Sequence, residues 1–280
     1  MGATMRNKTN WMTTIRLTVL LCILVSVLAA CAPVSNGLMR EASPETSALT
    51  LYIYEGSEVR RFSLFNTEET KSLLEKLDSV KSTKVEGWTL GDITLPVYGL
   101  ETGTTDGDAL VAAWSNGYWI TQNGAAYSFD FDFASLEQSY NWKNESSFPS
   151  FNVFPCAHFL SQDESGWNTT LLTPAVEPAP PPGISMILKS FDSTGLRVYI
   201  ANNSGSEWMY GETFVLQALL GNSWYEVPTL PGRWMFSMVG IIVRDGEVKQ
   251  HIYTLESYGD LPAGVYRVAA FGLSAEFSVE

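Results

Sequence analysis

A proline-rich segment divides this chain into two unequal parts. Residues 174–183 read Pro-Ala-Val-Glu-Pro-Ala-Pro-Pro-Pro-Gly, a sharp break in composition. Such a run favours an extended polyproline II conformation of about 3.1 Å per residue, so ten residues reach roughly 30 Å. We therefore predict a Pro-rich linker at 174–183 with separately folded domains on either side.

The part after the linker, residues 184–280, shows no helical periodicity. It contains short strand-like runs separated by turn signals such as Gly221-Asn222 and Asp245-Gly246, about ten residues apart. That spacing is typical of a β-sandwich. The predicted strands cover 185–191, 196–202, 213–220, 223–227, 236–244, 247–255, 265–271 and 275–279.

Two stretches of this part carry a family resemblance. They are Tyr210-Gly211-Glu212 through Trp224-Tyr225-Glu226-Val227-Pro228, and Tyr258-Gly259-Asp260-Leu261-Pro262-Ala263-Gly264-Val265-Tyr266-Arg267. In this order they resemble a bacterial immunoglobulin-like domain, a family that recurs in extracellular lipoproteins of Gram-positive bacteria. The resemblance implies an all-β immunoglobulin-like sandwich without catalytic residues. It also implies a structural tyrosine corner at Tyr266, whose hydroxyl bonds back to upstream backbone.

The part before the linker, residues 49–173, mixes both kinds of secondary structure. Strand-like runs at 50–54 and 58–65 form a predicted hairpin, and Asn66 with Glu69 resembles a capping box that opens a helix over 67–80. Further strands are expected at 93–100, 109–114, 118–121 and 125–133, joined in part by Asn-Gly turns. A second short helix is expected at 134–142. The fold class predicted for the chain is an α+β N-terminal domain, an antiparallel sheet with one or two helices, plus the all-β sandwich.

The N-terminal residues predict where the protein is located in the cell. Three basic residues precede fourteen mostly apolar residues from Leu17 to Ala30, and Leu28-Ala29-Ala30-Cys31 resembles a bacterial lipobox. A membrane-spanning helix needs roughly 20 apolar residues, so we favour a lipoprotein signal peptide at 1–30 over a transmembrane anchor. Cys31 is then the lipidation site and the first mature residue, anchored on the extracytoplasmic side of the cell membrane. Residues 31–48 read as a flexible tether.

Charge narrows the choice of partners. Fourteen basic and 30 acidic residues follow residue 30, a net charge of −16. Such a chain repels nucleic acid, so we expect no nucleic-acid partner. No metal site and no cofactor are predicted. Asp106, Asp108, Asp130 and Asp132 are candidate calcium ligands, but we favour the alternative of a solvated turn and a polar strand face.

Two remaining patterns bear on activity. Cys156 and His158 stand two residues apart, which is a minimal set for a nucleophilic thiol; the favoured alternative is that Cys156 is a partly buried apolar residue. Aromatic residues cluster at 114–127 and 208–234, where exposed rings would suit sugars or a protein partner. We therefore expect a non-enzymatic module that contacts a surface protein or cell-wall glycan. The alternatives are a carbohydrate-binding surface protein, or an enzyme with its site in residues 49–173.

Overall fold

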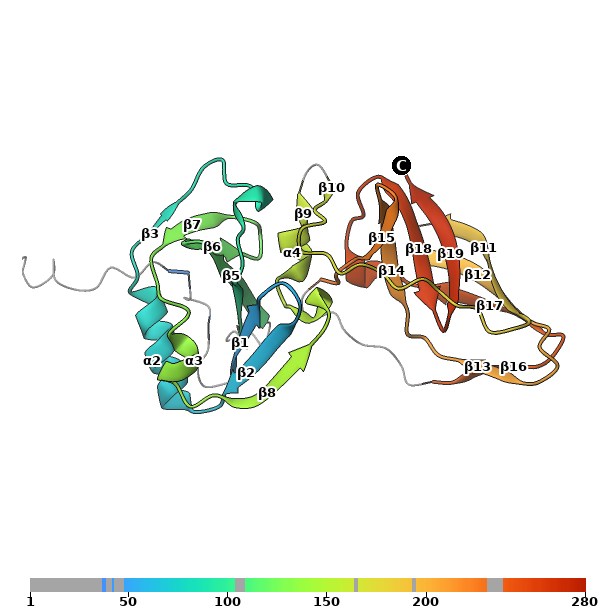
Figure 1. The fold of residues 1–280 in the computed structure, drawn as a ribbon, viewed down its shortest axis with the longest axis horizontal. Coiled ribbons are helices and arrows are strands. Elements are labelled where there is room, and N and C mark those ends of the chain that lie inside the picture. Colours follow the sequence, from blue (N-terminus) through green and yellow to red (C-terminus); the bar gives the residue numbers. More distant parts are fainter. Residues whose placement is uncertain are drawn as a thin grey trace, which may run out of the picture.

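The computed structural model describes residues 37–38, 42, 48–103, 109–163, 166–192, 195–230 and 239–280. It consists mostly of β-structure in several sheets, with few helices. Figure 1 shows two lobes side by side, a first lobe formed by the described residues up to 173 and a second lobe formed by residues 184–280. One hydrophobic core spans the second lobe, and two others lie within the first.

The first lobe is built on one eight-stranded sheet whose paired strands all run antiparallel. The two Asn-Gly turns have positive φ, at Asn116, Gly117 and Gly124, as hairpin turns between twisted strands require. In the order β3-β7-β6-β5-β4-β1-β2-β8, its members are β1 (Leu49–Tyr54), β2 (Val59–Leu64), β3 (Ser82–Lys84), β4 (Val97–Gly103), β5 (Ala109–Ser115), β6 (Tyr118–Thr121), β7 (Ala126–Phe129) and β8 (Lys143–Phe148).

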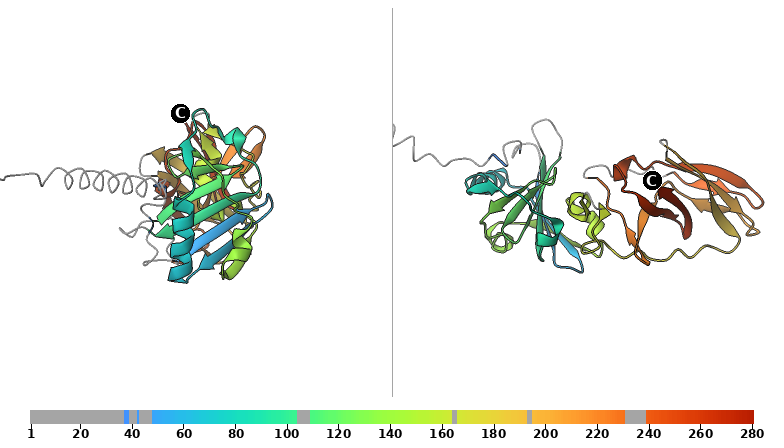
Figure 2. Two further views of the ribbon diagram at one scale, coloured as in Figure 1. Left: turned by 90° about the vertical axis from the view of Figure 1, so that its left-hand side faces the viewer. Right: turned by 90° about the horizontal axis from the view of Figure 1, so that it is seen from above.

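Helix α2 (Thr67–Asp78) packs on one face of this sheet, as its apolar stripe predicts. The Asn66 side chain accepts a hydrogen bond of 3.1 Å from the Glu69 N–H, which satisfies one of the free donors at the helix start. Leu73 and Leu77 are fully buried against the sheet. Figure 2, seen from above, shows α2 on the side of the sheet away from the second lobe.

The opposite face of the sheet is covered by residues that the sequence left without predicted structure. Phe151, Phe154 and Cys156 enter a second core on this face. Their backbone forms η2 (Phe151–Val153) and α4 (Ala157–Ser161), followed by the short hairpin of β9 (Gln162–Asp163) and β10 (Gly166–Trp167). These elements are too short for a periodic signal in the sequence. Their position is set by the large rings that they bury.

Two predicted strand boundaries in the first lobe were wrong. The strand predicted at 125–133 ends at Phe129, and the one predicted at 93–100 begins at Val97, after η1 (Leu90–Asp92). Phe131 and Phe133 still pack together at 5.0 Å between ring centroids, but from a turn that leads into α3 (Leu136–Ser139). Phe129, Phe131 and Phe133 alternate with polar residues as in a strand with one buried face, because all three rings pack into the same core.

The second lobe has two main sheets that face each other across one core. Leu196, Val198 and Ile200 fill it from one sheet, and Leu216, Val268 and Phe277 fill it from the other. The first sheet contains β11 (Ile184–Asp192), β12 (Gly195–Asn202) and β17 (Val248–Tyr253). The second contains β15 (Ser223–Glu226), β14 (Val215–Leu220), β18 (Gly264–Ala270) and β19 (Leu273–Val279), with η3 (Glu256–Tyr258) before β18.

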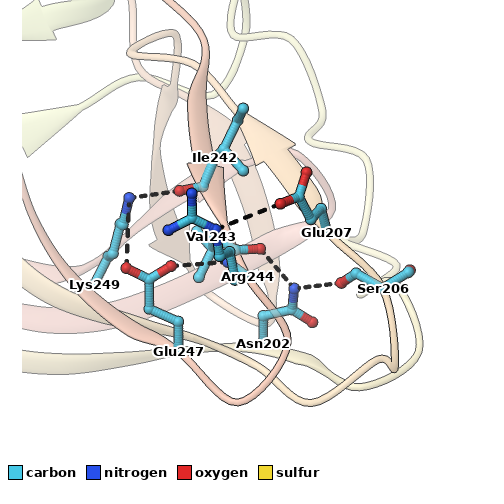
Figure 3. Close-up of polar contacts among 8 residues, drawn as sticks. All are labelled: Asn202, Ser206, Glu207, Ile242, Val243, Arg244, Glu247 and Lys249. Carbon is cyan, nitrogen blue, oxygen red and sulfur yellow. Dashed lines mark hydrogen bonds and ion pairs between the residues drawn. The ribbon is translucent and has the colours of Figure 1, made fainter.

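A further pair of strands was only partly predicted. β13 (Trp208–Tyr210) pairs with β16 (Ile241–Val243), and no strand was predicted at 208–210. Figure 3 shows how this pair is fixed: the buried Asn202 donates from Nδ2 to the carbonyl oxygens of Ser206 and Val243, at 2.8 and 2.7 Å. An exposed ion pair between Arg244 and Glu207 and a half-buried one between Lys249 and Glu247 lie beside it. Only a long-range contact makes three residues at 208–210 a strand.

Candidate functional site

The predicted lipidation residue, Cys31, lies outside the described residues. Within those residues no helix has the length and apolar character needed to cross a membrane. The described part of the predicted tether contacts the first lobe: the Gly37 N–H donates to Asp78 Oδ1 at 3.1 Å, and Leu38 and Ala42 pack against the core. Five residues lie between Cys31 and Gly37, the first described residue of the predicted tether.

The position of Cys156 does not suit a nucleophile. Its side chain has no exposed surface and lies in the core beneath the sheet, at the start of α4. Burial raises the pKa of the thiol well above its ordinary value, and the charge of Glu101 adds to this effect. Reactive cysteines need the opposite environment, exposed and electropositive. The structure therefore favours the apolar alternative for Cys156.

His158 is directed toward the second lobe. Its Nε2 lies 3.0 Å from the carbonyl oxygen of Tyr258, which makes Nε2 the donor. The imidazole also meets the Trp167 ring edge-on, with 5.6 Å between centroids. Desolvation by burial lowers the pKa of His158, opposed by the bond to Tyr258. The imidazole thus joins the two lobes, and Figure 1 shows α4, β9 and β10 between them.

The acceptor of this bond belongs to the stretch that carried the family resemblance. Tyr258 is buried, and its hydroxyl accepts the Leu216 N–H at 3.1 Å. Gly259 follows with φ 67° and ψ −154°, a region open essentially to glycine alone. This turn aims the carbonyl groups of Tyr258 and Asp260 outward, where His158 and Gln162 donate to them. The glycine of this motif therefore shapes the surface on which the first lobe docks.

Tyr266 lies at the same contact between the two lobes, which we call the junction. Its hydroxyl donates to the carbonyl oxygen of Pro262 at 2.7 Å, four residues upstream, which is the bond that a tyrosine corner requires. The same hydroxyl accepts the indole N–H of Trp167 at 2.9 Å. Trp167 packs against the core of the second lobe, although it belongs to the hairpin of the first. One hydroxyl thus connects the two lobes.

The proline-rich segment does not stand free as the predicted spacer. The Ala175 N–H donates to the carbonyl oxygen of Trp224 at 2.9 Å, and Pro174 forms a bridge with Tyr225. Further along, a Cβ added at Gly272 would lie 2.4 Å from the carbonyl oxygen of Ala179. The segment therefore runs along the second lobe in direct contact. Backbone groups of the segment thus find hydrogen-bond partners on a neighbouring sheet.

The buried side chain of Arg267 contacts the middle of the proline-rich segment. Arg267 is 4% exposed and donates from Nη1 to Glu177 Oε2 at 2.9 Å and from Nε to Gln217 Oε1 at 2.6 Å. Its guanidinium lies over the Trp224 ring, 4.3 Å from the centroid. Such stacking and pairing stabilise a guanidinium group inside a protein. Nearby, the Asn152 amide of the first lobe donates to Glu226 Oε2 at 2.8 Å, so the junction is polar as well as apolar.

The two predicted aromatic clusters do not form open platforms. Among their described rings none is exposed: Trp119 and Tyr210 are buried, and the others are half-buried. Trp114 stacks on Phe133 at 5.0 Å and donates its indole N–H to the Phe129 carbonyl. Trp224 lies beneath Arg267, while Trp234 is outside the described residues. Within the described part, these rings serve the cores and the junction.

The weighed calcium ligands are not brought together. Asp106 and Asp108 lie outside the described residues, and Asp130 and Asp132 follow the end of β7 rather than sharing a strand face. Asp132 Oδ1 accepts the Ser135 N–H at 3.2 Å and caps the turn before α3. No cluster of three His, Cys, Asp or Glu side chains that could hold a metal ion is found within the described residues.

Comparison with known proteins identifies one part of the chain. Residues 184–277 match a family model described as a bacterial Ig-like domain, which confirms the predicted immunoglobulin-like domain in the last third of the chain. No curated protein and no solved structure matches the chain. The contacts of Trp167 and His158 with the second lobe were not predicted, although His158 was considered beside Cys156, because each lies in a very short element whose partner is about 100 residues away.

Proposed function

We propose that this chain is a membrane-anchored extracytoplasmic lipoprotein with an α+β N-terminal domain, and that it acts as a non-enzymatic module for protein contact. Cys31 carries the lipid, and the Ig-like domain carries the contact surface. The lipobox-like sequence at 28–31 supports the anchor. The buried, high-pKa thiol of Cys156 removes the one nucleophile that the sequence offered.

The observation that carries the proposal is an apolar face on the outside of the Ig-like domain. In the β11-β12-β17 sheet, Ile187 pairs with Tyr199, and Val248 pairs with Ala201. Ile187 and Val248 are 62% and 60% exposed, and Tyr199 and Ile252 are exposed on the same side. Alternation along β12 sends Leu196, Val198 and Ile200 inward, so these residues are left outside. We call Ile187, Tyr199, Val248 and Ile252 the outer apolar face.

Charge indicates the kind of partner. The three strands carry three cations, Lys189, Arg197 and Lys249, and one carboxylate, Asp192, in a chain whose net charge is −13. Lys249 is paired with Glu247, whereas neither Lys189 nor Arg197 forms an ion pair among the described residues. An apolar centre beside unpaired cations complements a protein surface with an apolar centre and acidic residues around it.

The same face does not favour a glycan. Sugar binding on a sheet rests on rings that lie open to stack, and this face presents Tyr199 among three aliphatic residues. The contacts between the lobes support a protein partner as well: those of Trp167 and His158 hold the Ig-like domain in a defined orientation relative to the first lobe. The outer apolar face is thus presented to a protein partner in a fixed orientation.

Site-specific cross-linking in cells tests the proposal. A photoreactive amino acid replaces Tyr199 in the full chain, and in the control chain it replaces Phe65, an exposed ring of the first lobe. Cross-linked products are identified by mass spectrometry, and the purified partner is titrated against wild type, Ile187→Asp and Arg197→Glu. We expect one protein captured at 199 and not at 65, with at least tenfold weaker binding for both variants.

Other outcomes contradict the proposal. Equal capture at both positions, or binding unchanged by Ile187→Asp, would exclude the outer apolar face. Binding of wild type to a glycan array that is lost in Tyr199→Ala would favour the carbohydrate-binding alternative. Recovery of this chain's own copy as the cross-linked partner would replace a foreign partner with self-association.

A further inference from the structure

The two lobes are held together by a small set of contacts, most of them polar. The side-chain hydrogen bonds that join them include those of His158 to the Tyr258 carbonyl, Gln162 to the Asp260 carbonyl, Trp167 to the Tyr266 hydroxyl and Asn152 to Glu226. Among the described residues of the first lobe, Trp167 alone packs against the core of the second lobe. Domains that share a small, polar interface ordinarily move relative to one another.

The chain passes from one lobe to the other through Thr173. Leu171 is buried in a core of the first lobe, and the Thr173 hydroxyl accepts the Phe151 N–H at 3.1 Å. The Thr173 carbonyl accepts the Glu226 N–H of the second lobe at 2.9 Å, and Ala175 is hydrogen-bonded to the same lobe. Rotation of the backbone at Thr173 therefore turns the lobes relative to each other and leaves the core of each intact, as at a hinge.

His158 is one of two titratable side chains that the junction covers and whose pKa it shifts. Burial lowers the pKa of His158, opposed by its bond to the Tyr258 carbonyl. The phenols of Tyr258 and Tyr266 stay neutral, because burial raises the pKa of each. Glu164, between β9 and β10, lies outside the described residues. The charged groups on the described elements around His158 are three exposed carboxylates, Asp163, Glu256 and Asp260. A proton on His158 thus meets no buried counter-ion among the described residues.

Glu226 is the second such side chain. It is half-buried on β15, and its Oε2 accepts the Asn152 amide of the first lobe at 2.8 Å. Desolvation by burial raises the pKa of Glu226, opposed by a hydrogen bond from Ser150. The cation on the same sheet, Arg267, lies two strands away on β18 and is bound to Glu177. The closed junction therefore favours the neutral form of Glu226, as it favours the neutral form of His158.

We propose that the junction is a pH-sensitive clasp, which opens about Thr173 when His158 takes up a proton and closes again in stronger acid when Glu226 becomes neutral. In the open form the imidazolium and the carboxylate are both in water, and each lobe stays folded. Near neutral pH the closed form holds the Ig-like domain in the orientation described above. Opening turns that domain and, with it, the outer apolar face.

Proton binding gives the clasp a maximum of opening between two pH limits. His158 has its ordinary pKa of about 6.5 in the open form and a lower pKa in the closed form, so acid favours opening as the pH falls below about 6.5. Glu226 has its ordinary pKa of 4.5 in the open form and a higher pKa in the closed form. Acid therefore favours closing as the pH falls through that higher value toward 4.5.

Single-molecule energy transfer measures the ratio of open to closed chains. The full chain carrying Cys22→Ser and Cys31→Ser is labelled at cysteines that replace Lys71 on α2 and Gln250 on β17, both exposed, while Cys156 stays buried. We expect the ratio to rise about twofold or more below about pH 7 and to fall again toward about pH 4.5. Far-ultraviolet circular dichroism should not change over this range, because both lobes stay folded.

Three variants separate the two titrating groups. His158→Gln keeps a donor for the Tyr258 carbonyl but takes up no proton, so the rise should disappear. Glu226→Gln keeps an acceptor for the Asn152 amide, so the rise should remain and the fall should disappear. His251→Gln is the matched control: it is the other of the two histidines and packs against rings inside the second lobe, so its profile should match that of wild type.

Specific results would overturn the inference. A ratio that stays constant from about pH 7.5 to about pH 4.5 in the wild-type background would exclude the clasp, and so would a change in energy transfer that accompanies a loss of circular dichroism. A rise that persists in His158→Gln, or that is lost in His251→Gln, would exclude His158 as the trigger. A fall that persists in Glu226→Gln would exclude the part of Glu226. Neither a lipid nor a partner enters this experiment, so its outcome is independent of the proposed function.

Discussion

The bond between Trp167 and Tyr266 gives the sharpest test of how the two lobes are joined. Trp167→Phe keeps most of the ring but removes the N–H that reaches the Tyr266 hydroxyl at 2.9 Å. Because a single net hydrogen bond contributes about 1 kcal/mol and the Tyr266 hydroxyl keeps its bond to Pro262, we expect Trp167→Phe to lower the free energy of unfolding by about 1 kcal/mol. Tyr266→Phe removes the shared hydroxyl and leaves both the Trp167 N–H and the Pro262 carbonyl without this partner. We expect it to lower the free energy of unfolding by about 2–4 kcal/mol.

A double-mutant cycle isolates the contact across the junction. In the Tyr266→Phe background the Trp167 N–H has already lost its acceptor, so Trp167→Phe should cost almost nothing. The coupling energy should therefore be about 1 kcal/mol. The measurement is urea unfolding of the full chain, followed by circular dichroism. Trp208→Phe is the matched control, because Trp208 is half-buried against the same core but lies on the distal β13. Its cycle with Tyr266→Phe should be additive.

The reasoning is refuted if the two substitutions at the junction are additive within about 0.3 kcal/mol, which is the level expected of independent sites. It is also refuted if Trp208→Phe couples to Tyr266→Phe as strongly as Trp167→Phe does. Either result would mean that the two lobes do not share the Tyr266 hydroxyl in solution.

Three more predictions follow from buried groups. His158 has a folded-state pKa below the unfolded value of about 6.5. The unfolded chain then binds more protons, so the free energy of unfolding should fall as the pH drops below about 6.5. His158→Gln keeps a donor for the Tyr258 carbonyl and should make the free energy of unfolding, measured by urea titration at several pH values, depend less steeply on pH. Cys156 should resist a thiol reagent until urea unfolds the chain, and rapid labelling of the folded chain would contradict its burial. Gly272→Ala should lower the melting temperature more than Gly246→Ala: both have positive φ, but only the former places a Cβ against the proline-rich segment, so equal shifts would contradict that contact.

Local signals predicted the regular parts of the fold. The helix at 67–78 was readable because Asn66 and the leucines at 73, 74 and 77 satisfy capping and burial within a few residues of one another. The Asn-Gly turns were readable for the same reason, since the positive φ that they need is a property of single residues. The Ig-like domain combined such turns with a recognisable motif at 258–267.

The junction could not be predicted from the sequence. Trp167 is a lone ring in a two-residue strand, and nothing near it in the chain indicates that its acceptor is Tyr266, 99 positions later. The proline-rich run misled in the same way: its composition sets an extended backbone, but only the three-dimensional structure shows that Arg267 and Trp224 lie beside it.

The most direct test of the account is the mass of the N-terminal peptide of the chain purified from membranes. We predict that this peptide begins at Cys31 and carries a diacylglyceryl group, and that the Cys31→Ser chain is no longer processed there or held by a lipid. A mature chain that begins elsewhere, or an unmodified Cys31 in membrane-bound protein, would contradict the anchor and with it the outward presentation of the Ig-like domain.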